Sequence, residues 1–146
     1  RVQCGVAIED LPEEHNRVVL DPDHRDSNGI PGAKIAYTMC ENTIRMMDHG
    51  IARATEILQA AGATDLYTSK TSLNSPGHLL GTARMGTDPE RSVVNEWGRS
   101  HDVKNLFIVD GSIWVTGGGM NPTSTIQALA LYVADNIKQR LATLFD

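Results

Sequence analysis

Three consecutive glycines at 117–119 constrain the fold most, because they separate an apolar segment from a long amphipathic one. Before them, NLFIVDG at 105–111 is apolar up to its Asp-Gly end, a pattern typical of a buried strand. After them, Pro122 stands at a first helical turn and Asn121 is a natural N-cap. Apolar residues then recur at helical spacing, at positions 126, 129, 130, 133, 134, 137 and 141. The order predicts a strand, a glycine loop and a long helix.

An earlier helix is predicted over residues 41–61, where apolar side chains recur every three or four positions. Asn42 or Thr43 can cap its start, and Gly62 stands where a left-handed residue ends many helices. This segment predicts one amphipathic helix packed on a small core.

The first 40 residues predict a small antiparallel sheet, with strands at 2–8 and 33–38. Between them, DPDHRDSNG at 21–29 favours a hairpin loop over a calcium loop, because Arg25 stands where a third oxygen ligand belongs. We therefore predict an α+β fold, in which a small antiparallel sheet with a helix precedes the strand–loop–long helix piece.

Composition excludes several classes of function. The net charge is −5, so the chain has no electrostatic footprint for nucleic acid. No apolar run approaches the ~20 residues of a membrane-spanning helix. Cys4 and Cys40 are too few for a disulfide framework and too far apart for a metal site, so we expect no metal.

His78 and Asn121 are the best candidates for chemistry, and each has a plainer interpretation. His78 lies in the glycine-flanked stretch GHLLGTARMG, where it can act as a general acid or base or only bond a backbone carbonyl. Asn121 can contact a ligand at the helix start or only cap the helix. The residues alone leave both alternatives open.

Two longer motifs carry a family resemblance. HLLGTARMGTDPERSVVN, followed by GRSHDVKNLFIVDGSIWVTGGGMNPTSTIQALALYVAD, resembles the C-terminal part of the glucose-methanol-choline (GMC) flavoprotein oxidoreductases, nearest the gluconate, sorbose and fructose dehydrogenases and pyranose oxidase. The resemblance implies FAD as cofactor and an alcohol, polyol or sugar as substrate. It also implies that 1–70 belong to a substrate-binding domain and 71–146 to the C-terminal part of the FAD-binding domain.

The resemblance assigns roles to individual residues. His78 matches the family's catalytic base, and Asn121 matches the second residue that hydrogen-bonds the substrate oxygen. Asp110 and Gly111 match a strand end beside the flavin's ribityl and pyrophosphate groups. Pro122 and Thr123 match the helix start at the flavin's pyrimidine edge.

One departure from the family is the absence of its G-x-G-x-x-G motif, which seats the ADP half of FAD. We therefore expect a C-terminal segment that lacks the N-terminal dinucleotide-binding half and is inactive alone. The strand at 105–111 would then present an exposed edge that invites self-association. Two other hypotheses stay open: a non-catalytic binding or assembly module, and a hydrolase using Ser112 with His78 or His101.

Overall fold

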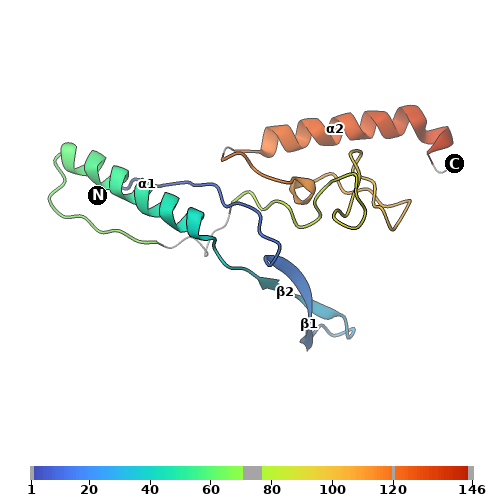
Figure 1. Cartoon of the computed structure of the whole chain (residues 1–146), viewed down its shortest axis with the longest axis horizontal. Coiled ribbons are helices and arrows are strands. Elements are labelled where there is room, and N and C mark those ends of the chain that lie inside the picture. Colours follow the sequence, from blue (N-terminus) through green and yellow to red (C-terminus); the bar gives the residue numbers. More distant parts are fainter. Residues whose placement is uncertain (1, 71–76, 120, 145–146) are drawn as a thin grey trace. The chain divides into compact units, whose positions relative to one another are not determined.

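The computed structural model describes residues 2–70, 77–119 and 121–144. Residue contacts divide the chain into two compact units, Arg1–Pro76 and Gly77–Asp146. A two-stranded antiparallel sheet and two long helices confirm the predicted α+β class (Figure 1). The expected boundary between residues 70 and 71 adjoins 71–76, which lie outside the described residues.

In the first unit, strand β1 (Arg17–Arg25) pairs antiparallel with β2 (Pro31–Ala36). The pairing runs from Arg17 opposite Ala36 to Asp21 opposite Gly32, and then shifts before Arg25 meets Pro31. Asp26 closes the turn, because its Oδ1 accepts hydrogen bonds from the amides of Asn28 (2.8 Å) and Ile30 (2.9 Å). The prediction of a hairpin is confirmed, although β1 extends through half of the expected loop.

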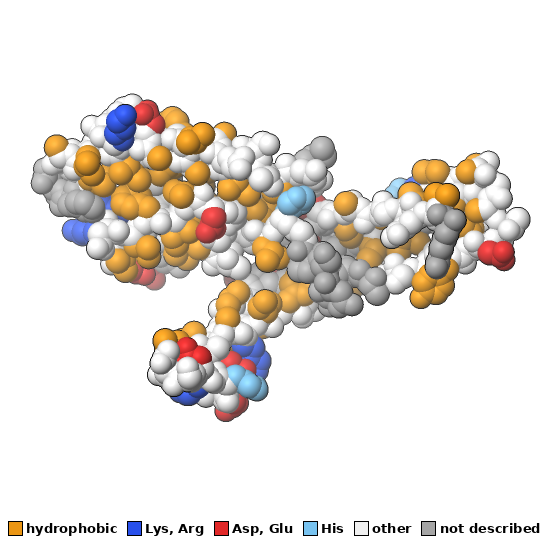
Figure 2. All heavy atoms as spheres, turned by 180° about the vertical axis from the view of Figure 1, so that it is seen from behind, with side chains coloured by type: hydrophobic (Ala, Val, Ile, Leu, Met, Phe, Trp, Pro, Cys, Tyr) orange, Lys and Arg blue, Asp and Glu red, His pale blue; other side chains and the backbone are white. Residues whose placement is uncertain are grey.

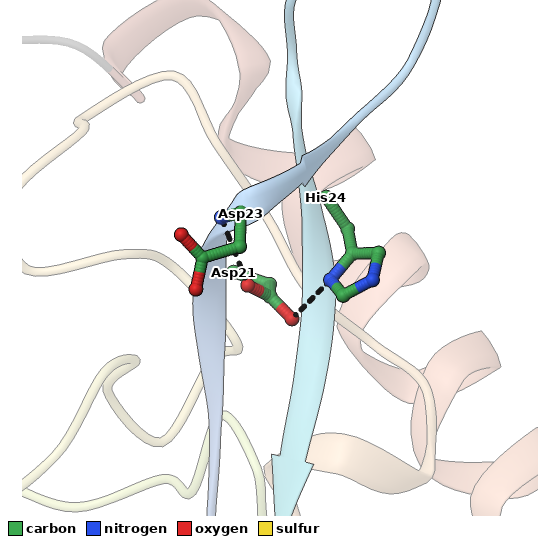
Figure 3. A network of polar contacts seen from close by, with 3 residues as sticks. All are labelled: Asp21, Asp23 and His24. Atoms are coloured by element: carbon green, nitrogen blue, oxygen red, sulfur yellow. Dashed lines mark hydrogen bonds and ion pairs between the residues drawn. The ribbon is translucent and has the colours of Figure 1, made fainter.

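Polar residues at the end of β1 form a small network of hydrogen bonds centred on Asp21 (Figure 3). Asp21 accepts the amide of Asp23 at 3.0 Å through Oδ1 and contacts Nδ1 of His24 at 3.0 Å through Oδ2. His24 is itself 84% exposed. In the part of the chain that the structure describes, no three His, Cys, Asp or Glu side chains form a metal-binding group.

The strand predicted at residues 2–8 is wrong. This segment has no ladder partner and packs instead on the first helix, where a Cβ at Gly50 would overlap the side chain of Val6. The partner of β2 is β1, because a hairpin closes a short loop whereas residues 2–8 would need a longer and entropically costlier closure.

Helix α1 (Glu41–Ala60) occupies the predicted range. Its N-cap is Cys40, whose sulfur accepts the amide of Thr43, so the predicted caps at Asn42 or Thr43 are wrong. Gly62 ends the helix as predicted, with φ of 89° and its amide bonded to the Gln59 carbonyl at 2.9 Å. Glycine adopts a left-handed backbone conformation at little energetic cost, which explains why Gly62 ends the helix.

The second unit contains little regular structure before its helix. Isolated bridges join Met85 to Val94, Val94 to Ser100, and Arg99 to Phe107. The strand predicted at 105–111 is therefore wrong, because among the described residues it has one bridge, at Phe107, and no neighbouring strands to complete a ladder. The described residues thus form no strand edge at 105–111, and self-association of the chain stays a prediction.

Helix α2 (Thr123–Arg140) confirms the predicted long helix, and a 3₁₀ turn η2 (Leu141–Thr143) follows it. Its Val133 is 1% exposed and packs in the core of this unit, whose most deeply buried described residues also include Val94 (0%) and Ile113 (1%). Its N-cap is Pro122 and no side chain caps it, so the predicted Asn121 cap is wrong.

Hydrophobic side chains are exposed at many places on the visible surface (Figure 2). Leu131 on α2 is 72% exposed and Ile35 on β2 is 74% exposed. Neither described helix has the length and apolar character that a membrane crossing needs.

Candidate active site

His78 lies in an irregular segment at the start of the second unit, and its side chain is exposed. Its φ is 58°, which makes it the one described non-glycine residue with a left-handed backbone. Such a conformation costs of order 1–3 kcal/mol and persists where the surrounding structure determines it, often at functional sites. Histidine is among the residues that tolerate it best. The backbone therefore singles out the histidine that the sequence singled out.

The segment after His78 pairs with the turn that contains Asp110 and Gly111. The amide of Ala83 donates to the Ser112 carbonyl at 2.9 Å, and the amide of Met85 donates to the Ile113 carbonyl at 2.8 Å. Ser112 and Ile113 belong to the 3₁₀ turn η1 (Gly111–Ile113), which begins directly after Asp110. Two predicted site segments, far apart in sequence, are thus joined by backbone hydrogen bonds.

Asp110 caps the η1 turn with its side chain. Its Oδ1 accepts the Ser112 amide at 2.7 Å. Hydrogen bonds from the Ser112 hydroxyl and amide lower the pKa of Asp110 against a smaller opposing effect of burial. The carboxylate is therefore held in its charged form with a fixed orientation.

Gly111 is the point where three segments of the candidate site meet. A Cβ built on it would lie 3.0 Å from both the Leu79 carbonyl oxygen and Cδ2 of Leu80, and 3.2 Å from Cδ1 of Ile126. Leu79 and Leu80 directly follow His78, and Ile126 belongs to the first turn of α2. A side chain at this position would require these segments to shift, so the close approach favours glycine.

The start of α2 offers backbone donors that have no acceptor among the described residues. The first helical bond in this turn runs from the Ile126 amide to the Pro122 carbonyl at 2.9 Å, and no side chain caps the helix. The amides of Thr123, Ser124 and Thr125 precede that bond, and all three residues are exposed. These N–H groups and the positive end of the helix dipole favour an electron-rich ligand.

Asn121 lies one residue outside the N-cap of α2 and is exposed. Its carboxamide has no hydrogen-bond partner among the described residues, so it is not committed to the helix. Pro122 is buried beside it and anchors the helix start. The plainer interpretation of Asn121 as a cap is thereby removed.

The structure gives no support to a hydrolase that uses His101. Its Nε2 lies 3.0 Å from the Ser92 hydroxyl and 3.1 Å from the Gly86 carbonyl oxygen. The Ser92 hydroxyl donates to the Asp88 carbonyl at 2.5 Å, so the imidazole N–H is the donor to both contacts. His101 holds a turn, and the Ser112 hydroxyl hydrogen-bonds Asp110 rather than a histidine.

Some features of this unit were not found from the sequence. Leu80 contacts two glycines of the site, and an apolar residue in an irregular segment carries no signal of such a role. The indole Nε1 of Trp114 is buried and has no hydrogen-bond partner among the residues that the structure describes. A shallow hollow of about 250 Å³ lies beside Arg84 and Arg91, and none of the predicted site residues lines it.

Comparison with known proteins decides the family. A sequence profile of the GMC oxidoreductases matches residues 12–130, most of the chain. The chain belongs to the GMC oxidoreductase family. It corresponds to the C-terminal domain of GMC oxidoreductases, as the motifs around His78 and Asn121 predict.

Relatives of this GMC domain include alcohol and sugar dehydrogenases. It is 48% identical over 139 residues to a 2-methyl-1,2-propanediol dehydrogenase of Mycolicibacterium austroafricanum, covering 94% of this chain and 25% of the relative. It is 37% identical over 142 residues to the fructose dehydrogenase large subunit of Gluconobacter japonicus, covering 94% and 26%. The chain thus spans about a quarter of the length of these relatives.

A solved structure shares the fold of this domain. The crystal structure of pyridoxine 4-oxidase from Mesorbium loti matches with a TM-score of 0.59 at 21% identity, over 78% of this chain and 26% of that one. At this identity the likeness supports the fold alone.

Proposed function

We propose that this chain is the C-terminal segment of an FAD-dependent oxidoreductase that oxidises CH–OH groups of an alcohol, polyol or sugar. The observation that carries the proposal is the convergence of the His78 segment, the Asp110 turn and the start of α2 on Gly111. The names of the relatives favour alcohols and sugars as the substrate class. Since the chain spans a quarter of their length, we propose that the segment alone is inactive.

Two regions of the chain have separate roles in this proposal. Residues 1–70 contribute to a substrate-binding domain, and residues 71–146 contribute to the FAD-binding domain with both candidate catalytic side chains. The division of contacts into units Arg1–Pro76 and Gly77–Asp146 supports it. The dinucleotide-binding half is the remaining partner of this segment.

The residues at the start of α2 fit the flavin end of FAD. Three uncapped N–H groups at 123–125 and the helix dipole suit the electron-rich pyrimidine edge. Asp110, ionised and fixed by Ser112, suits hydroxyl groups of a ribityl chain as a hydrogen-bond acceptor. When bound, FAD supplies a hydride acceptor for the carbon of the alcohol.

His78 has the role of base in this mechanism. Alcohol oxidation releases the hydroxyl proton as the hydride leaves carbon, and a ring nitrogen of neutral His78 takes that proton. The left-handed backbone at His78 sets the direction in which its side chain leaves the main chain, and alignment with the hydroxyl matters as much as basicity.

Asn121 has the role of hydrogen-bond donor. Its carboxamide N–H donates to the substrate oxygen as negative charge develops there, and a single donor of this kind contributes on the order of 3 kcal/mol. Freedom from capping leaves the group available for this bond.

The test uses the full-length flavoprotein that carries this chain. Each member of a panel of alcohols, polyols and sugars is added under anaerobic conditions, and reduction of the flavin is monitored by its visible absorbance. We expect the yellow colour to bleach with one substrate class, and a His78→Asn variant to bleach at least about a hundredfold more slowly. Asparagine tolerates φ of 58° and removes the base without straining the backbone. His24→Asn, at an exposed histidine of the β1–β2 hairpin, is the matched control.

Two outcomes would overturn the proposal. A colourless full-length protein that cannot be reconstituted with FAD would favour the binding or assembly module. A yellow protein in which His78→Asn bleaches as fast as His24→Asn would remove His78 from the chemistry.

A further inference from the structure

We propose that Leu80 is the positioning residue for His78, because its side chain is seated between Gly111 and Gly117 and fixes the segment that carries the imidazole. The inference rests on the proposed role of His78 as base. It adds a residue whose effect on the reaction passes through backbone placement rather than through contact with substrate.

The side chain of Leu80 lies between two glycines, and each glycine is close to a different one of its two methyl groups. A Cβ on Gly117 would lie 2.8 Å from Cδ1 of Leu80, and a Cβ on Gly111 would lie 3.0 Å from Cδ2. A Cβ on Gly117 would therefore force Cδ1 of Leu80 to move, and a Cβ on Gly111 would require a smaller shift of Cδ2. Leu80 therefore links the segment of His78 to the η1 turn and to the glycine loop before α2.

Leu80 is the side chain nearest in sequence to His78 whose packing against the site the structure defines, since the backbone hydrogen bonds to the η1 turn begin only at Ala83. Its side chain is exposed and has no hydrogen-bond partner among the described residues. Its φ of 58° is a conformation that neighbouring structure must maintain. Leu80 is two residues further along, and the Leu79 carbonyl between them lies against Gly111. A shift of Leu80 is thus passed to His78 over a very short backbone segment.

The seat of Leu80 is distinct from the general core of the unit. The fully buried apolar side chains there are Val94, Ile113 and Val133. Leu80 is only half-buried, and its two methyl groups lie close to Gly117 and Gly111. Truncation of Leu80 should therefore affect the reaction more than the melting temperature.

The test uses the full-length flavoprotein with Leu80→Ala, Gly117→Ala, the double variant and Leu80→Met. The readouts are the limiting rate of anaerobic flavin reduction, the substrate concentration at half saturation, the flavin absorbance spectrum and the melting temperature. We expect each alanine variant to lower the limiting rate about tenfold or more, with half saturation and flavin spectrum nearly unchanged. Leu80→Met refills the seat and restores the rate to within about threefold of the parent.

The double variant gives the sharpest prediction. Gly117→Ala slows the parent by displacing Cδ1 of Leu80, so in the Leu80→Ala background it should cost less than about twofold. Val94→Ala, at a fully buried residue outside the candidate site, is the control, and it should lower the melting temperature without lowering the limiting rate.

Failure of this inference can be told from failure of the proposed function. If Leu80→Ala behaves like Val94→Ala, or if the two alanine substitutions are additive, Leu80 is ordinary packing and the inference is overturned. If instead His78→Asn leaves the rate unchanged, the proposed base is wrong and the positioning role falls with it.

Discussion

Replacement of Asn121 by alanine should remove catalysis without loosening the helix that follows. If Asn121 capped α2, its loss would cost about 0.5–2 kcal/mol of stability. The structure gives it no such bond, because the helix begins at Thr123 with Pro122 as an N-cap without side-chain hydrogen bonds. An exposed substitution of this kind changes stability by no more than about 0.5 kcal/mol. Loss of a donor to the substrate oxygen should lower the limiting rate by about 10²–10³-fold.

Asn95 is the matched control for Asn121, since its carboxamide does hold the backbone. Its Oδ1 accepts the amides of Trp97 at 3.0 Å and Arg99 at 3.1 Å. Each bond contributes about 0.5–1.5 kcal/mol, so Asn95→Ala should cost about 1–3 kcal/mol. We expect opposite phenotypes: Asn95→Ala lowers the melting temperature and keeps the rate, whereas Asn121→Ala keeps the melting temperature and loses the rate.

The assay is thermal unfolding and anaerobic flavin reduction of the full-length flavoprotein in both variants. A fall in melting temperature for Asn121→Ala equal to that of Asn95→Ala, with the rate retained, would mean that the carboxamide caps the helix after all. Asn121 would then be a capping residue and not a donor to the substrate oxygen.

Three further predictions concern single groups. Burial, reinforced by the hydrogen bond to Asp10, raises the pKa of Tyr37 to about 12 from an ordinary value near 10. The contribution of the Tyr37 hydroxyl to stability is therefore present below pH 10 and is lost as the pH rises to about 12. Tyr37→Phe should remove this late step from an ultraviolet titration. Ser112→Ala should raise the pKa of Asp110 towards its ordinary value in a carboxyl NMR titration, and an unchanged pKa would contradict the assigned cause. Gly98→Ala should lower the unfolding free energy by about 2–4 kcal/mol, because Gly98 has φ of 67° and its new Cβ would overlap the Ile108 carbonyl; an unchanged melting temperature would show that the site relaxes.

The two helices could be predicted from the sequence because a helix is determined by nearby residues. The spacing that predicted residues 41–61 is realised in α1 at Glu41–Ala60, and Gly62 ends it as expected. The caps were less predictable, since they depend on where the chain enters the helix. Cys40 caps α1 and Pro122 caps α2, although serine, threonine, aspartate and asparagine are the preferred residues at that position.

The strands could not be predicted reliably because pairing depends on distant partners. Residues 2–8 alternate like a strand, yet β2 pairs with β1, whose end at Asp21–Arg25 has the composition of a turn. The run at 105–111 is apolar enough for a central strand, but a ladder needs a partner that pairs over several residues, and the described residues supply one bridge. The apolar pattern indicates the preference of a segment, whereas the available partners decide whether a strand forms.

The candidate site shows the same division between what is local and what is spatial. His78 and Asn121 could be named from motifs, because polar residues among glycines are visible in the sequence. What joins their segments is a set of close approaches at Gly111 and Gly117, which motifs do not describe. With little regular secondary structure before α2, the geometry of the site depends on the absence of two Cβ atoms as much as on hydrogen bonds. Leu80, an unremarkable residue in the sequence, acquires a role because it fills the space that those glycines leave.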